Sequence, residues 1–161
     1  MQRIVCTFFG FSLFALVLAL APPRAAFAMN TDTTPTKSTS EEAYFKAGEL
    51  AIKAWKWPEA IDLMQKVLKE NPNNADAYNY IGYANRHLKK YDAAFANYQK
   101  ALKLNPEHRG ALEYLGEAYL QTGDLAGAEK QLKALDGICF FGCKEYDALK
   151  AAIADYKAKK G

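Results

Sequence analysis

Apolar residues recur at helical spacing along most of the chain, and the clearest case lies between residues 75 and 106. The stripe of a first helix falls at Tyr78, Ile81, Ala84 and Leu88. A second stripe follows at Ala94, Phe95, Tyr98, Ala101 and Leu102. Lys89-Lys90 suits the end of the first helix, where a cation is favourable, and Tyr91-Asp92 is predicted as a turn with a capping Asp. Asn105-Pro106 ends the second helix, because proline disfavours helical geometry in the residue before it.

This helix pair is one unit of a repeat with a period of 34 residues. The columns that keep this step are Gly48, Gly82 and Gly116; Ala60, Ala94 and Ala128; Met64, Tyr98 and Leu132; and Asn71-Pro72 with Asn105-Pro106. A glycine or alanine lets two crossing helices approach closely, and the larger column fills the space beside them. The period therefore predicts an all-α fold made of stacked helix pairs.

The period ends after Leu135. Asp136-Gly137 is predicted as a turn, residues 138–142 as an apolar link, and a last helix is expected from about Lys144 to Lys157. Its packed face is expected at Tyr146, Leu149, Ile153 and Tyr156. Its lysines alternate with acidic residues, which favours a solvated face over a polybasic patch. We expect this helix to be the polar cap that a terminal repeat needs.

The first 28 residues have the pattern of a secretory signal peptide. Arg3 precedes an uncharged apolar run over residues 4–21, and Ala26-Phe27-Ala28 is a small-x-small cleavage site. The run is also just long enough for a membrane anchor, but Arg24 and the cleavage site favour removal after Ala28. We therefore expect a periplasmic or secreted protein.

Residues 29–40 are rich in Thr and Ser and are predicted to be a flexible linker. Thr39 and Glu42 have the spacing of a capping box, so the first helix is expected to begin near Glu41.

Composition and charge exclude several classes of function. The chain is 50% hydrophobic and 24% charged, the balance of a soluble globular protein. Its formal net charge is +3, and the signal-like segment holds two Arg and no acidic residue, so the remainder carries +1. A near-neutral chain has no electrostatic reason to bind nucleic acid or anionic lipid tightly. We expect neither a nucleic-acid partner nor stable membrane insertion after cleavage.

Sequence motifs for catalysis are missing. The chain has no Gly-rich loop before a helix, no Gly-Lys-Ser/Thr and no His-Glu-x-x-His. His87 falls in the last turn of its helix, where a cation is favourable, and this is its expected role. We therefore predict no enzyme, no catalytic residue and no cofactor.

The repeat columns resemble the tetratricopeptide repeat. The matching residues are Tyr78-x-x-Ile81-Gly82, Ala94-x-x-x-Tyr98 and Pro106 in the second unit; Leu112-x-x-Leu115-Gly116-x-x-Tyr119 and Ala128-x-x-x-Leu132 in the third; and, more loosely, Tyr44-x-x-Ala47-Gly48-x-x-Ala51, Ala60-x-x-x-Met64 and Pro72 in the first. Trp57, Tyr91 and Leu125 fill the bulky position before each second helix. Asn85 departs from the pattern, as does the third unit, which lacks the Asn-Pro pair.

This resemblance implies a right-handed α-solenoid of three helix-turn-helix units in an exported bacterial protein. The units are expected at residues 41–74, 75–108 and 109–136, followed by a cysteine-bearing link and capping helix at 137–161.

The resemblance also implies a concave surface that binds a protein or peptide and is lined by the first helices. The outward positions on those helices are Phe45, Glu49, Ile52, Asn79, Tyr83, Arg86, Glu113, Glu117 and Leu120. An ordinary solvated surface is the alternative, but Phe45, Tyr83 and Leu120 repeat on one face and favour a groove. Some family members clamp peptide carboxylates with cations. The positions where such a clamp would need cations hold Phe45 and Glu49, and again Glu113 and Glu117, so a partly basic or tyrosine-accepting ligand suits this surface better.

Cys139 and Cys143 are the one pair with redox or metal-binding chemistry. In an oxidising compartment we expect a disulfide that pins the capping helix. A redox pair and a soft-metal site for Cu(I) or zinc are the alternatives, and they define a second hypothesis, a thiol- or metal-handling protein.

Two further expectations concern contacts. Trp55 lies in the first turn, where it either lies across its own helix pair or serves as an exposed contact anchor. Self-association is a third hypothesis, because the first helix of a repeat array has an open edge on which another copy can stack.

Overall fold

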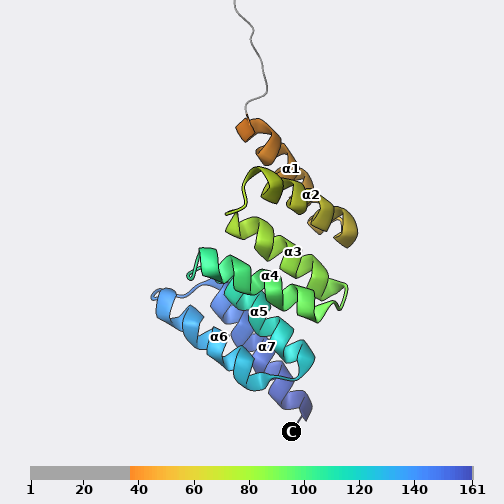
Figure 1. Ribbon diagram of the computed structural model, residues 1–161. Coiled ribbons are helices and arrows are strands. Elements are labelled where there is room, and N and C mark those ends of the chain that lie inside the picture. Colours follow the sequence, from red (N-terminus) through yellow and green to blue (C-terminus); the bar gives the residue numbers. More distant parts are fainter. Residues whose placement is uncertain (1–36, 161) are drawn as a thin grey trace, which may run out of the picture. The chain divides into compact units, whose positions relative to one another are not determined.

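The computed structural model describes residues 37–160, with side chains from residue 40 onward, and these residues form seven α-helices and no strand (Figure 1). The helices are α1 (Lys37–Lys53), α2 (Trp57–Glu70), α3 (Ala75–His87), α4 (Tyr91–Leu104), α5 (Arg109–Thr122), α6 (Leu125–Ile138) and α7 (Lys144–Lys160). This confirms the all-α class, the three helix pairs and the final helix. The predicted signal peptide and residues 29–36 lie outside the described residues.

The glycine column marks the places where helices cross most closely. A Cβ atom added at Gly48 would lie 2.6 Å from Met64 Cε, and one at Gly82 would lie 2.7 Å from Tyr98 Cδ1. A Cβ at Gly116 would lie 2.5 Å from Leu149 Cδ2. The predicted steric role of the glycines is therefore confirmed. In the third repeat, however, the side chain in closest contact comes from α7 instead of the repeat's own second helix.

Polar side chains fix the starts of three helices. The Asn74 side chain accepts a hydrogen bond from the Ala77 backbone N–H at 2.9 Å, and Asp124 accepts one from Gly127 at 2.8 Å. His108 caps α5 in the same way through its Nδ1 atom, 3.1 Å from the Ala111 nitrogen. Each satisfies a backbone donor that the first turn of a helix leaves unpaired.

Several predicted boundaries are wrong by a few residues. The first helix begins at Lys37, inside the predicted linker, because each residue added to a formed helix gains a hydrogen bond at little cost. Asp92 is not a cap: α4 begins at Tyr91, and its N-cap is Lys90, without a side-chain hydrogen bond. Asp136-Gly137 is not a turn, because α6 continues to Ile138, which packs against the C-terminal core.

The three intra-repeat turns share a backbone feature that the sequence analysis missed. Trp55, Lys89 and Gly123 follow one another at the 34-residue step, and their φ angles are +62°, +58° and +89°. Only glycine adopts this left-handed conformation without steric cost. The first two turns therefore hold strained residues where the third has the residue that fits.

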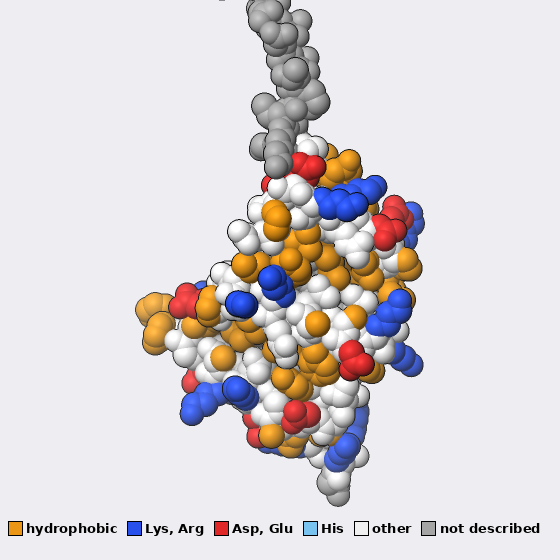
Figure 2. Space-filling model, in the orientation of Figure 1, with side chains coloured by type: hydrophobic (Ala, Val, Ile, Leu, Met, Phe, Trp, Pro, Cys, Tyr) orange, Lys and Arg blue, Asp and Glu red, His pale blue; other side chains and the backbone are white. Residues whose placement is uncertain are grey.

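α7 packs on α5 and α6, as predicted for a cap. Its residues Leu149 and Ile153 are buried in a core cluster with Leu112, Leu120 and Leu135, against which Tyr146 and Tyr156 also pack. On the face seen in Figure 2, the Lys and Arg side chains lie in several separate places with acidic groups among them. Among the described residues, no helix has the length and apolar character needed to cross a membrane.

Candidate functional site

The first helices of the three repeats, α1, α3 and α5, contact one another in order along the stack. α1 contacts α3, and α3 contacts α5, whereas α2, α4 and α6 make no comparable contacts with one another in the described part of the chain. The row of first helices is therefore the more closely spaced one and lies on the inner side of the stack. We call the surface of α1, α3 and α5 on this side the inner face.

The nine residues predicted to point outward do lie on these three helices, but not all of them are open to solvent. Asn79, Arg86 and Leu120 are buried, so the prediction that they are outward positions is wrong. Leu120 packs into the core against α7, which the repeat pattern did not foresee because α7 lies outside the period. The other predicted residues are partly exposed: Phe45, Glu49, Ile52, Tyr83, Glu113 and Glu117.

Arg86 lies at the centre of the inner face. Its Nη2 atom lies 2.7 Å from Glu117 Oε2 on α5, and its guanidinium carbon lies 5.3 Å from the Tyr83 ring and 5.7 Å from the Tyr114 ring. Only 6% of Arg86 is exposed, so this charge depends on its carboxylate and ring partners for stabilisation. The side chain thus links the second repeat to the third.

Aromatic rings continue from Arg86 toward the first turn. The Tyr83 ring lies 4.7 Å from Tyr114 and 4.5 Å from His87, and His87 stacks on Trp57 at 4.3 Å with 10° between the ring planes. Burial, and secondarily the charge of Arg86, lowers the pKa of His87. His87 is therefore disfavoured as the cation expected at the helix end, and it acts as a stacked ring. We call Trp57, Tyr83, His87 and Tyr114 the aromatic row.

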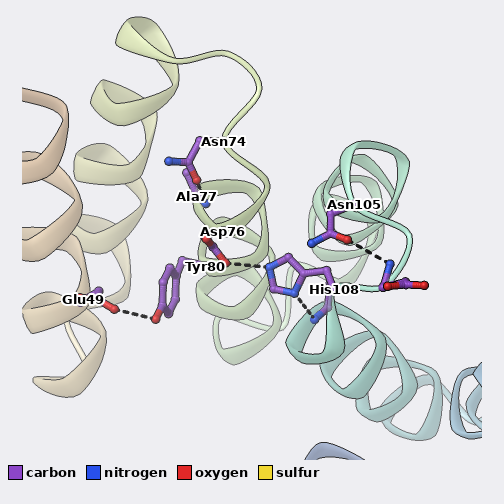
Figure 3. Close-up of polar contacts among 9 residues, drawn as sticks. Glu49, Asn74, Asp76, Ala77, Tyr80, Asn105 and His108 are labelled. Atoms are coloured by element: carbon purple, nitrogen blue, oxygen red, sulfur yellow. Dashed lines mark hydrogen bonds and ion pairs between the residues drawn. The ribbon is translucent and has the colours of Figure 1, made fainter. Parts of the chain in front are cut away.

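Tyr80 and Tyr114 are members of the inner face that the sequence analysis missed, although they are 34 residues apart. The Tyr80 hydroxyl donates a hydrogen bond to Glu49 Oε1 at 2.9 Å (Figure 3). The Tyr80 ring also meets the Phe45 ring edge-on at 5.7 Å. Burial, followed by the hydrogen bond to Glu49, raises the pKa of Tyr80. The repeat step itself was the signal that could have identified both tyrosines.

A second polar contact between α3 and the start of α5, made by Asp76 and His108, lies beside the inner face (Figure 3). His108 Nδ1 accepts the cap hydrogen bond from Ala111, so the ring proton is on Nε2, which lies 3.0 Å from Asp76 Oδ1. The hydrogen bond from His108 is the main cause that lowers the pKa of Asp76. This contact fixes the register of the second and third repeats.

Carboxylates give the inner face a negative character. Glu113 and Glu117 stand one turn apart on α5, Glu49 lies on α1, and Glu145 of α7 is near enough to Glu113 to affect its pKa. Burial raises the pKa of Glu113 to about 7, and repulsion by Glu117 and then Glu145 adds to the effect. The inner face can therefore offer aromatic surfaces and carboxylates to a ligand.

Cys139 and Cys143 form the predicted disulfide, with their Cα atoms 5.6 Å apart. It closes a loop between α6 and α7 that holds Phe140 and Phe141, both exposed. The described residues contain no group of three His, Cys, Asp or Glu side chains placed to hold a metal ion.

Trp55 is exposed and stacks on Trp57 at 6.1 Å, so it does not lie buried across its own helix pair.

Comparison with known proteins identifies the repeats. Two family models described as tetratricopeptide repeat match the chain, one over residues 45–105 and the other over residues 86–153. No curated protein sequence matches it.

Several solved structures share the fold. The Arabidopsis OM64 TPR domain superposes with a TM-score of 0.67 at 18% identity, over 74% of this chain and 98% of that one. PcrH in complex with the chaperone binding region of PopD gives 0.68 at 20%, over 77% and 96%. The first TPR of Spaghetti (RPAP3), bound to the HSP90 peptide SRMEEVD, gives 0.65 at 23%, over 75% and 95%.

Proposed function

The chain belongs to the tetratricopeptide repeat family, and we propose that it is a non-catalytic scaffold that holds a segment of a partner protein on its inner face. The observation that carries this proposal is the aromatic row beside the carboxylates of α5. Rigid aromatic rings provide contact area at low entropic cost and dominate the energetics of many protein interfaces.

The ligand that fits this face carries basic and aromatic side chains. Carboxylates from two helices face it, Glu49 of α1 and Glu113 and Glu117 of α5, and its buried cation, Arg86, is already paired with Glu117. Spaghetti (RPAP3) binds an HSP90 peptide that ends in acidic residues, SRMEEVD. Such a tail would meet like charge here, whereas Arg or Lys side chains gain charge-assisted hydrogen bonds.

The scaffold is proposed to work in the periplasm or outside the cell, in assembly or quality control of the envelope. Two features support this location: the signal-like pattern of residues 1–28 and the Cys139–Cys143 disulfide. Disulfides persist in oxidising compartments.

The test uses two fluorescent decapeptides of equal length, one rich in Arg and Tyr and one with Glu in place of every Arg. We expect the basic peptide to bind at least about tenfold more tightly, and Tyr83→Ala to weaken its binding by about tenfold or more. Tyr91→Ala, at the first residue of α4, is the matched control, with thermal midpoints measured for both variants. Equal binding of the two peptides, or unchanged binding by Tyr83→Ala, contradicts the proposal.

A thiol-handling role is the second candidate. Cys143 directly precedes α7, where a helix N-terminus stabilises a thiolate. Replacing both cysteines by serine separates the two functions. A scaffold loses stability and keeps binding the basic peptide, whereas a thiol protein keeps its fold and loses its activity in the host.

A further inference from the structure

The large apolar side chains that remain exposed fall in two places. In the described part of the chain they are Leu50 (58% exposed), Trp55 (77%), Phe140 (85%) and Phe141 (103%). The first two lie at the end of α1 and the turn after it, and the last two lie in the disulfide loop between α6 and α7. Hydrophobic atoms protrude on opposite edges of Figure 2 at the positions where Figure 1 shows these two segments.

The face of α1 that carries Leu50 is exposed, whereas the corresponding faces of α3 and α5 are covered. Leu50 is followed at the 34-residue step by Ala84 and Ala118, and both of these are 0% exposed. Ala118 packs in a cluster with Ala94 and Tyr98 of α4, the second helix of the preceding repeat. α1 has no preceding repeat in the described residues, so its stacking face is without a partner there.

This face is hollowed. A cavity of about 290 Å³ opens between α1 and the start of α2. Its lining residues are Ala47, Leu50, Ala51, Ala54, Lys56 and Glu59. An apolar cavity of roughly 150 Å³ holds one benzene molecule. The α1 hollow therefore has room for two phenyl rings.

The disulfide loop carries two such rings. The Cys139–Cys143 bond closes a loop in which Phe140 and Phe141 stand side by side in sequence. A ring closed by a disulfide has few conformations, so the two side chains lose little further entropy when they are bound. The outer side of α7 offers no competing apolar surface, because its exposed residues are mainly Lys, Asp and Ala.

We propose that Phe140 and Phe141 of one copy insert into the α1 hollow of a second copy, so that the protein associates head to tail. The contact joins two different surfaces, so each added copy leaves one hollow and one loop free. Association therefore continues beyond the dimer as concentration rises. The inner face takes no part, and the proposal does not depend on the ligand proposed for it.

The contact is weak. Each phenylalanine buries about 150–250 Å². Two of them therefore remain below the roughly 1,200 Å² typical of stable interfaces. We expect a monomer at low concentration and growing species at roughly 0.1–1 mM, the range of weak affinity.

Sedimentation velocity of the protein in the form its host produces tests the proposal. The weight-average mass should rise with concentration, and both Phe140→Ser/Phe141→Ser and Leu50→Asp should hold it at the monomer value. Tyr83→Ala, on the inner face, is the control and should self-associate like the parent. A parent protein that stays monomeric up to 1 mM overturns the proposal.

Mixing the two defective variants gives the sharper result. The loop variant keeps its hollow and the hollow variant keeps its loop, so an equimolar mixture should form a heterodimer and nothing larger. A loop–loop contact predicts instead that Leu50→Asp alone still associates, and a hollow–hollow contact predicts that Phe140→Ser/Phe141→Ser alone still associates. Either result, or a mixture that stays monomeric, would refute the head-to-tail geometry. Far-UV circular dichroism of each variant shows that loss of association does not reflect unfolding.

Discussion

Glu113 should make the stability of this protein depend on pH across the neutral range. Burial raises its pKa from 4.5 to about 7, and the negative charges of Glu117 and Glu145 contribute after burial. Lys144 and Arg86 offset only part of the effect. Glu113→Gln keeps the shape of the side chain and removes its ionisation.

The sign follows from the direction of the shift. Because the folded chain holds this proton more tightly than the unfolded chain, the stability contributed by the protonated carboxyl is full below about pH 4.5 and is lost as pH rises toward 7. At 1.36 kcal/mol per pKa unit, full burial would correspond to about 3 kcal/mol. Solvent reaches part of the carboxyl and screens its charge, so we expect about 1–2 kcal/mol.

Urea denaturation followed by circular dichroism from pH 4.5 to 8.5 measures this effect. Glu113→Gln should match the parent near pH 4.5 and exceed its unfolding free energy by about 1–2 kcal/mol at pH 8. Glu107→Gln, an exposed glutamate in the turn before α5, is the control and should track the parent throughout. A difference between Glu113→Gln and the parent that stays constant with pH refutes the reasoning.

Three further predictions concern stability, each measured by chemical denaturation. Gly116→Ala should cost about 1–3 kcal/mol, since its Cβ would lie 2.5 Å from Leu149 Cδ2, and Leu149→Ala in the same chain should make that cost much smaller. Lys89→Gly should stabilise the protein by about 1 kcal/mol, because φ at this residue is +58°; a loss of stability would contradict the assigned strain. His108→Ala should cost about 1–2 kcal/mol through the lost cap and the lost contact with Asp76, and an unchanged midpoint would argue against the capping role.

The repeat was predictable because its columns have a steric cause that a sequence displays directly. Gly48 and Gly82 are small because Met64 and Tyr98 lie against them, and both members of each pair recur at the 34-residue step. Asn105-Pro106 similarly marks the end of α4 through the chemistry of proline. Local rules of this kind determine where helices stop and how a repeat packs within itself.

The inner face was less predictable because the burial of its side chains depends on contacts between repeats. Arg86 looks solvent-exposed on an isolated helix, and it is buried because Glu117 and Tyr114 of the next repeat enclose it. Leu120 is buried by a helix that lies outside the period. Helical position alone does not reveal such coverage, since it comes from residues far away in sequence.

The contact between Gly116 and Leu149 also limits how this array can lengthen. In the first two repeats the space beside the glycine is occupied by a side chain of the same repeat, Met64 or Tyr98. A copy of either repeat would therefore include both members of the contact. In the third repeat Leu149 of α7 occupies that space. A gene duplication that placed another unit after residue 138 would separate α5 from the side chain that completes it. A unit added ahead of α1 would leave the contact between Gly116 and Leu149 intact.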